Sequence, residues 1–155
     1  MSSHFKHAVV LAVLCGVVCA PAALAHKPVV IDEGPTDAET AHEIGDVDVS
    51  QVGYHHAMPG QPELWFTFET EAGQQLYLQL GVPEIDRYEG LRPAMALLGP
   101  GLPAVEVPFD VPEGYGGIVY DMESVDPILF DEEFTGTMSW QFPAETPTVE
   151  TGGKY

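Results

Sequence analysis

Residues 64–80 read LWFTFETEAGQQLYLQL, and this stretch decides the fold class. Apolar side chains recur at every second position on both sides of a polar break that contains Gly73. Such alternation places the apolar residues on one face of a β-strand. These residues are Leu64, Phe66 and Phe68 before the break and Leu76, Leu78 and Leu80 after it. The sequence therefore predicts an antiparallel hairpin that turns at residues 71–73 and presents this apolar face to a core.

Further strand signals follow on both sides of the predicted hairpin. They cover residues 47–54, 94–98, 105–109, 118–120, 128–130 and 137–142. The run 94–98 is almost wholly apolar, which is typical of a central buried strand. Pro108 marks 105–109 as an edge strand, because proline donates no hydrogen bond to a ladder. With 14 prolines, 16 glycines and no amphipathic helix pattern, the chain is predicted to be an all-β, antiparallel β-sandwich or jelly roll.

The first 25 residues have the pattern of a secretory signal peptide. Lys6 precedes an apolar run at residues 8–20, and Ala23 and Ala25 form a small-x-small cleavage site. The run is too short to cross a bilayer, so no membrane span is expected. Both cysteines, Cys15 and Cys19, lie inside this leader, and the exported chain is therefore expected to lack disulfides. The predicted location is the periplasm or the extracellular medium.

The charge and composition of the chain exclude two classes of protein, nucleic-acid binders and disordered acidic tails. The chain carries 24 Asp and Glu against 5 Lys and Arg, a formal net charge of −19, so phosphate backbones would be repelled and nucleic-acid binding is excluded. A hydrophobic content of 45% is too high for a disordered acidic tail. Residues 26–45 are polar and punctuated by proline and glycine, which predicts an extended N-terminal arm, and residues 46–155 are predicted to form one β-sandwich domain.

The end of the chain predicts a truncated domain. Residues 148–155 read TVETGGKY, which has the pattern of a strand, a tight turn and the first residues of another strand. A sandwich interrupted at this point would lack the rest of its last strand. The alternative is a short frayed tail at the end of a finished domain.

Several of these segments resemble a known domain family. Residues 50–54, 64–68, 72–78 and 95–100 read SQVGY, LWFTF, AGQQLYL and MALLGP. Together they resemble the small exported β-sandwich domains of the bacterial pre-peptidase C-terminal type. Such domains accompany secreted enzymes or stand alone without catalytic residues. The resemblance therefore implies an accessory or binding module, and it assigns no functional residue.

The histidines offer the most specific candidate chemistry. Cleavage after Ala25 would make His26 the N-terminal residue, whose α-amino group and imidazole can chelate one copper ion. His55 and His56 are adjacent at the end of a predicted strand, where neighbours point to opposite faces, so at most one of them would join His26. A site of His26, His55 and His56 would resemble the histidine brace of copper-dependent polysaccharide monooxygenases. The alternative is a set of ordinary exposed histidines, to which His42 also belongs.

Clustered carboxylates make calcium a second candidate ion, because calcium accepts six to eight oxygen ligands from irregular loops. The clusters are Asp46 with Asp48, and Asp121, Glu123 and Asp126 with Asp131, Glu132 and Glu133. No segment has the spacing of an EF-hand. The alternative is a solvated acidic surface that keeps an exported protein dispersed.

Catalytic and sugar-binding patterns are sparse. The serines Ser50, Ser124 and Ser139 lack a nucleophile-elbow setting. A carboxylate pair on a sheet face, such as Glu69 with another acid, could act as acid and base in a glycosidase, although an acidic chain offers many such pairs. Three aromatic residues on predicted strands, Trp65, Tyr77 and Trp140, could form a platform for sugars or serve in packing.

Taken together, the sequence predicts an exported, non-catalytic accessory or binding module of the periplasm or cell envelope. Its ligand surface is expected on the loops at residues 83–93 and 110–117, where alternation breaks down. The expected partner is an envelope protein or a carbohydrate. The alternative function is a copper-binding protein that uses His26.

Overall fold

The computed structural model describes residues 26–31, 34–60, 62–132 and 136–155, and the predicted signal peptide lies outside these residues. The described chain contains eleven strands and one short 3₁₀-helix. In order they are β1 (Lys27–Ile31), β2 (His42–Glu43), β3 (Gln51–His55), β4 (Phe66–Thr67), β5 (Glu69–Thr70), β6 (Gly81–Pro83), η1 (Asp86–Tyr88), β7 (Ala94–Pro100), β8 (Tyr115–Asp121), β9 (Ile128–Glu132), β10 (Thr137–Gln141) and β11 (Gly153–Lys154). The all-β prediction is confirmed, and among the described residues no helix has the length and apolarity to cross a membrane.

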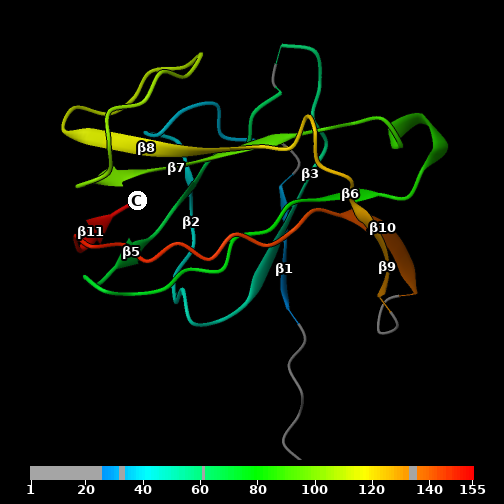
Figure 1. Cartoon of the computed structure of the whole chain (residues 1–155), viewed down its shortest axis with the longest axis horizontal. Helices are drawn as coiled ribbons and strands as arrows, with labels where there is room; N and C mark the ends of the chain where they lie inside the picture. Colours follow the sequence, from blue (N-terminus) through cyan, green and yellow to red (C-terminus); the bar gives the residue numbers. More distant parts are fainter. Residues whose placement is uncertain (1–25, 32–33, 61, 133–135) are drawn as a thin grey trace, which may run out of the picture.

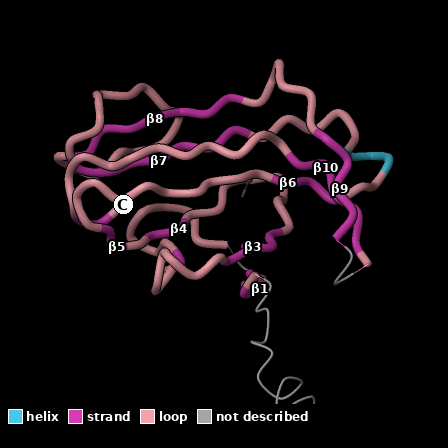
Figure 2. The backbone as a smooth tube through the Cα atoms, turned by 60° about the horizontal axis from the view of Figure 1, so that its bottom comes forward, coloured by secondary structure: helices cyan, strands magenta, loops and turns pink. Residues whose placement is uncertain are grey.

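The strands form a sandwich-like arrangement of small, mostly antiparallel sheets (Figure 1). β7 pairs with β8 over seven residue pairs, from Ala94 opposite Asp121 to Pro100 opposite Tyr115. β10 lies between β6 and β9 in a three-stranded antiparallel sheet. Figure 2 shows β7 and β8 along one side of the molecule and β3, β4 and β5 along the other. The layers thus enclose the apolar faces that alternation predicted.

The predicted hairpin of residues 64–80 is the main correction. Its two halves do not form a ladder with each other among the described residues. In the first half β4 pairs with β2 of the N-terminal arm and β5 with β11, while the second half is bridged to residues 145–148. These bridges join Gln75 to Thr148 and Leu78 to Glu145. Alternation defines which face is apolar but not which strand lies beside it.

This pairing brings segments that are distant in the sequence together in two core clusters. Leu76, Leu97, Val149 and Tyr155 form one buried cluster, with Phe68 packed against it. A second cluster consists of Val82, Met122 and Phe142, with Leu80 and Trp140 at its edge. The inward positions predicted after the break, Leu76, Leu78 and Leu80, are indeed buried or half-buried, while Tyr77 is exposed. The face assignment is therefore confirmed although the strand pairing is wrong.

For the other predicted strands, the structure likewise confirms some features and corrects others. The apolar run at 94–98 is a strand, β7, but it is paired on one side only within the described chain. The strands predicted at 128–130 and 137–142 are confirmed as β9 and β10, and the structure pairs them antiparallel. The expected edge strand at 105–109 joins no ladder with any strand that the structure describes, although Val105, Val107 and Phe109 are half-buried. Pro103 and Pro108 have no backbone N–H to donate to a neighbouring strand. This segment is instead held to β8 by a hydrogen bond from the Gly117 amide to the Pro103 carbonyl, at 2.7 Å.

The N-terminal arm contains two short strands that the sequence did not predict. β1 pairs in parallel with β3, and β2 pairs in parallel with β4. The strand predicted at 47–54 begins only at Gln51, because Asp46 accepts hydrogen bonds from the amides of Asp48 and Val49 and turns the chain. At the other end, Gly153 and Lys154 form β11 after a turn, as the pattern of residues 148–155 indicated, and the predicted truncation stays a prediction.

Candidate functional site

A wide, open hollow lies at the turn that follows β5. Its volume is about 750 Å³. Eight residues line it, namely Val47, Asp48, Glu69, Thr70, Glu71, Ala72, Gly73 and Gln74. Gly73 has a positive φ of 84°, a conformation that glycine adopts without strain and that allows the chain to turn sharply here. The hollow therefore arises where this turn meets the segment around Asp48 from a distant part of the chain.

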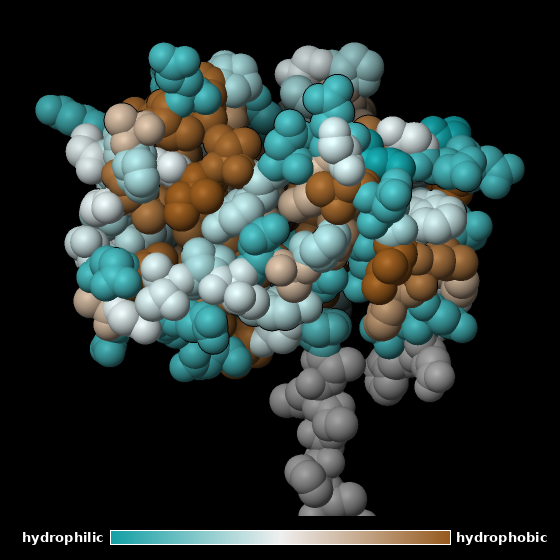
Figure 3. Space-filling model, in the orientation of Figure 1, coloured by the Kyte–Doolittle hydropathy of each residue, from teal (hydrophilic) through white to brown (hydrophobic). Residues whose placement is uncertain are grey.

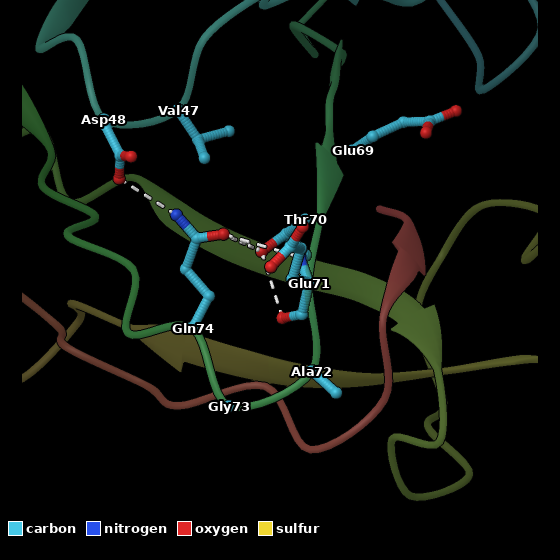
Figure 4. Close-up of a pocket in the computed structure, with 8 residues that line it drawn as sticks. All are labelled: Val47, Asp48, Glu69, Thr70, Glu71, Ala72, Gly73 and Gln74. Atoms are coloured by element: carbon cyan, nitrogen blue, oxygen red, sulfur yellow. Dashed lines mark hydrogen bonds between the residues drawn. The ribbon is translucent and has the colours of Figure 1, made fainter.

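Gln74 holds the two sides of the hollow together (Figure 4). Its amide nitrogen donates to the Asp48 carboxylate at 3.0 Å. Its amide oxygen accepts from the Thr70 hydroxyl at 2.7 Å and from the Glu71 backbone amide at 3.4 Å. Thr70 is 8% exposed, so its hydroxyl depends on this partner. The arrangement makes the polar lining an ordered surface rather than a loose collection of side chains.

The hollow is acidic. Asp48, Glu69 and Glu71 are exposed carboxylates, and no lysine or arginine is among the lining residues. Lys154 lies directly opposite Glu69 in the β5–β11 ladder, at the border of the hollow. Carboxylate, hydroxyl and amide oxygens accept hydrogen bonds, so the surface favours ligands that carry several donors such as hydroxyl or amino groups.

The loops that sequence reasoning favoured have a different structure. Residues 83–93 contain η1, and a small hollow of about 140 Å³ lies there between Glu84, Ile85, Asp86, Glu89 and Trp140. The Arg87 guanidinium stacks over the Tyr88 ring at 4.6 Å, and Arg92 lies 5.8 Å from the Phe142 ring centroid. Both cations thus contact aromatic rings of the chain itself.

The loop at 110–117 leads directly into β8. The Tyr115 amide donates to the Pro112 carbonyl at 3.0 Å, which forms a tight turn before the strand. The sequence missed the larger hollow because its two sides come from residues 47–48 and 69–74. No local pattern indicated that these two segments would meet.

The predicted copper residues lie at opposite ends of one strand pair. In the parallel ladder Lys27 lies opposite Gln51 and Ile31 opposite His55, so His26 is at the start of the ladder and His55 at its end. The His26 imidazole Nδ1 instead lies 2.5 Å from the Ser50 hydroxyl. Because His26 is level with Ser50, five residue steps of parallel strand separate the two histidines, roughly 16 Å along the strand axis. The structure therefore does not bring His26 and His55 together.

His55, His56 and His42 also have separate surroundings. Both ring nitrogens of His55 are shielded from solvent and have no hydrogen-bond partner among the described residues. His56 follows β3 and is exposed, while the His42 ring meets Phe66 edge-on at 6.0 Å. No group of three His, Cys, Asp or Glu side chains in the described parts of the chain is placed to hold a metal ion. Copper binding by the amino group and imidazole of His26 alone stays a prediction.

Several predicted calcium carboxylates shape local turns. The Asp46 carboxylate accepts from the Asp48 amide at 3.0 Å, and the Asp121 carboxylate accepts from the Glu123 amide at 2.9 Å. These are bonds to the residue two positions later, which is typical of aspartate in turns. Glu133 lies outside the described residues, and calcium binding stays a prediction.

The aromatic residues proposed as a sugar platform enter three different environments. Trp65 packs edge-on against Phe109 at a centroid distance of 4.8 Å. Trp140 packs against the cluster of Val82, Met122 and Phe142. Tyr77 is 67% exposed and donates from its hydroxyl to Gln79. Two of the three thus serve in packing.

Comparison of the chain with protein-family models, with curated proteins and with solved structures gave no significant match. The resemblance to pre-peptidase C-terminal domains therefore stays an expectation. The candidate site rests on the geometry of the hollow alone.

Proposed function

We propose that this chain is an exported, non-catalytic binding module of the periplasm or cell envelope that binds a carbohydrate in the hollow beside Gln74. The signal pattern of residues 1–25 supports export. The all-β architecture offers turns at the ends of rigid strands, which is where binding surfaces of such folds occur. The observation that carries the proposal is the ordered, acceptor-rich hollow of about 750 Å³.

The chemistry of the lining favours an amino sugar over a neutral sugar. Asp48, Glu69 and Glu71 supply negative charge, and a protonated amine forms charge-assisted hydrogen bonds to carboxylates. The Thr70 hydroxyl and the Gln74 amide are already engaged with each other and keep the acceptors in place. An amino sugar therefore gains both hydrogen bonds and electrostatic attraction in this hollow.

The proposal excludes hydrolysis. The Ser50 hydroxyl lies 2.5 Å from the His26 imidazole, yet both side chains are exposed, and within the described parts of the chain no carboxylate bonds to this histidine. A serine triad needs such an orienting acid and a preorganised site for the oxyanion. We therefore expect no esterase turnover, and the non-catalytic assignment also predicts no glycosidase turnover by the carboxylates of the hollow.

A titration with glucosamine oligomers tests the proposal. The exported protein is titrated calorimetrically with soluble glucosamine, N-acetylglucosamine and glucose oligomers of equal length. We expect binding of the glucosamine oligomers, weaker binding of the N-acetylated ones, and loss of affinity as salt rises. The matched variants are Gln74→Ala, which removes the central amide, and Gln75→Ala, whose side chain reaches Thr146 and does not line the hollow.

Gln74→Ala is expected to weaken glucosamine binding by about tenfold, equivalent to about 1.4 kcal/mol, whereas Gln75→Ala should leave it unchanged. Equal affinities for the charged and neutral oligomers, or equal effects of the two variants, would argue against ligand binding in this hollow. Release of reducing sugar from any oligomer would contradict the non-catalytic assignment.

A further inference from the structure

The edge strand β9 exposes apolar side chains that nothing in the described chain covers. β9 is the outermost strand of the sheet β6–β10–β9, so its outer backbone edge has no strand partner among the described residues. Ile128, Leu129 and Phe130 are 68%, 47% and 37% exposed. The side chain of Met138 on β10 is also 37% exposed. Figure 3 shows these side chains as a brown patch over the β9–β10 hairpin.

The exposed apolar residues lie on both faces of this hairpin. Leu129 is opposite Trp140, which in turn is opposite the buried Val82, so these three residues share the core-facing side of the sheet. Ile128 and Phe130 alternate with Leu129 and therefore lie on the other side. Because β9 extends beyond the core cluster, even its core-facing Leu129 is nearly half exposed. A ligand that covers only one face would leave apolar surface in water, whereas an added strand would shield both.

The charges around β9 indicate the kind of strand that fits. Asp126 lies just before β9, and Asp131 and Glu132 lie at its end, so both ends of the apolar run carry carboxylates. Glu84 and Asp86 line the neighbouring small hollow with Trp140. The nearest cation of that loop, Arg87, stacks on Tyr88. An added strand with lysine or arginine at both ends would therefore meet opposite charges at both ends of β9.

A second copy of this chain is a poor occupant of the same edge. In an antiparallel pair the start of one β9 lies beside the end of the other, so Asp126 would meet Asp131 and Glu132. In a parallel pair, like ends meet, and carboxylates again face carboxylates. Each copy also carries a formal net charge of −19. Like charges placed opposite each other destabilise a sheet, so self-pairing is opposed in either orientation.

We propose that β9 is a docking edge for an extended, cationic-ended segment of another protein, which adds to the sheet as a fourth strand. Its backbone would bond to the open edge of β9, its apolar residues would cover Ile128, Phe130 and Leu129, and its terminal lysines or arginines would pair with Asp126 and Asp131. This inference goes beyond the proposed carbohydrate site and does not depend on it. The hollow beside Gln74 and the edge of β9 are lined by different residues.

The experiment uses a synthetic peptide as the probe. The peptide acetyl-Lys-Val-Thr-Val-Thr-Val-Lys-amide forms an extended strand with a cation at each end. Two control peptides carry glutamate in place of both lysines, or N-methyl groups on the three central residues, which remove the hydrogen-bond donors. We expect the lysine peptide to bind and both controls to bind at least about tenfold more weakly. Its affinity should fall as salt rises.

Two charge-matched variants locate the site. Ile128→Lys/Phe130→Lys places cations on the edge and should weaken binding of the lysine peptide at least about tenfold, since charged side chains on an edge block strand addition. Val119→Lys/Tyr77→Lys adds the same charge at positions that are 44% and 67% exposed elsewhere, and should retain binding. Unchanged thermal unfolding of both variants shows that the sheet is intact, because all four positions are exposed.

Several results would overturn the inference. These are absence of binding by the wild-type chain, equal affinity for the lysine and glutamate peptides, or equal effects of the two double variants. Concentration-dependent dimerisation that Ile128→Lys/Phe130→Lys abolishes would make a second copy the occupant and would also overturn it. Gln74→Ala should leave peptide binding unchanged, which separates failure of this inference from failure of the carbohydrate proposal.

Discussion

Phe68 and Tyr155 form a reciprocal backbone pair and stack their rings. The Phe68 amide donates to the Tyr155 carbonyl at 3.1 Å, and the Tyr155 amide donates to the Phe68 carbonyl at 2.9 Å. Their rings lie 6.0 Å apart at an interplanar angle of 12°. Tyr155 is 6% exposed and belongs to the core cluster with Leu76, Leu97 and Val149. The strand that leads to the hollow is therefore held in place by the last residue of the chain.

Truncation of this side chain should strongly destabilise the fold. Tyr155→Ala removes a buried ring, and we expect it to lower the free energy of unfolding by about 3–5 kcal/mol in urea denaturation. Tyr77→Ala removes the same side chain at a position 67% exposed and should change stability by about 0.5 kcal/mol or less. Similar losses in the two variants would contradict the place of Tyr155 in the core.

The Tyr155 hydroxyl should make stability depend on pH above the neutral range. Burial, aided by the charge of Tyr115, raises the pKa of Tyr155 above its usual value of 10.0. The folded state then holds the proton more tightly than the unfolded state does. This contribution is complete below about pH 10 and is lost as pH rises through the folded-state pKa.

Tyr155→Phe should therefore flatten the decline of stability between neutral and strongly alkaline pH. The variant also loses the hydrogen bonds that the hydroxyl donates to the Pro100 and Thr151 carbonyls, at a cost of about 1 kcal/mol at neutral pH. Urea denaturation from pH 8 to pH 11 measures both effects. A steeper alkaline decline in the variant than in the wild-type chain would contradict the raised pKa.

Gly116 should tolerate no side chain. A Cβ atom there would lie 2.1 Å from the Leu102 carbonyl oxygen and 2.2 Å from that of Pro103, both of them backbone atoms. Gly116→Ala is expected to cost at least about 2 kcal/mol of unfolding free energy, because the 101–105 segment must move away from β8. Gly90→Ala has open space around it and should leave stability unchanged or raise it by up to about 1 kcal/mol. A neutral Gly116→Ala would show that this segment does not pack on β8 as described.

Any copper held by His26 should be independent of His55. The two histidines lie at opposite ends of the β1–β3 ladder. In protein whose chain starts at His26, His55→Ala should leave the affinity for Cu(II) unchanged, whereas His26→Ala should lower any tight binding at least about tenfold. Electron paramagnetic resonance distinguishes the two ligand sets. A change in the copper spectrum on His55→Ala would contradict the separation seen in the ladder.

Alternation along the chain predicted the faces of strands but not their neighbours. Leu76, Leu78 and Leu80 point inward as predicted, because a period of two fixes the face of an extended chain. Their neighbours come from residues 145–149, and no local signal in the sequence connects those segments. The turn predicted at residues 71–73 is present. The strands on its two sides, however, pair with different partners and not with each other: β5 pairs with β11, and residues 75–78 with residues 145–148.

The candidate site was harder to predict for the same reason. The hollow depends on contact between Asp48 and Gln74, which are 26 residues apart. Its polar residues are unremarkable in sequence, since an acidic chain offers many such groups. For the histidines, the sequence did suggest a site, because imidazoles bind copper. The parallel pairing of β1 with β3 nevertheless places His26 and His55 far apart. Both the position of the hollow and the separation of the histidines depend on which distant strands pair. Local sequence patterns do not specify this pairing.

The native intact mass of the protein recovered from the exported fraction tests the central claim most directly. One spectrum reports the first residue of the chain and any bound ion or ligand. The account predicts a chain that starts at His26, carries no copper and takes up glucosamine oligomers when they are added, with weaker uptake by Gln74→Ala than by Gln75→Ala. A chain that keeps residues 1–25 and remains in the cell interior, or one that carries a stoichiometric copper ion, would contradict it.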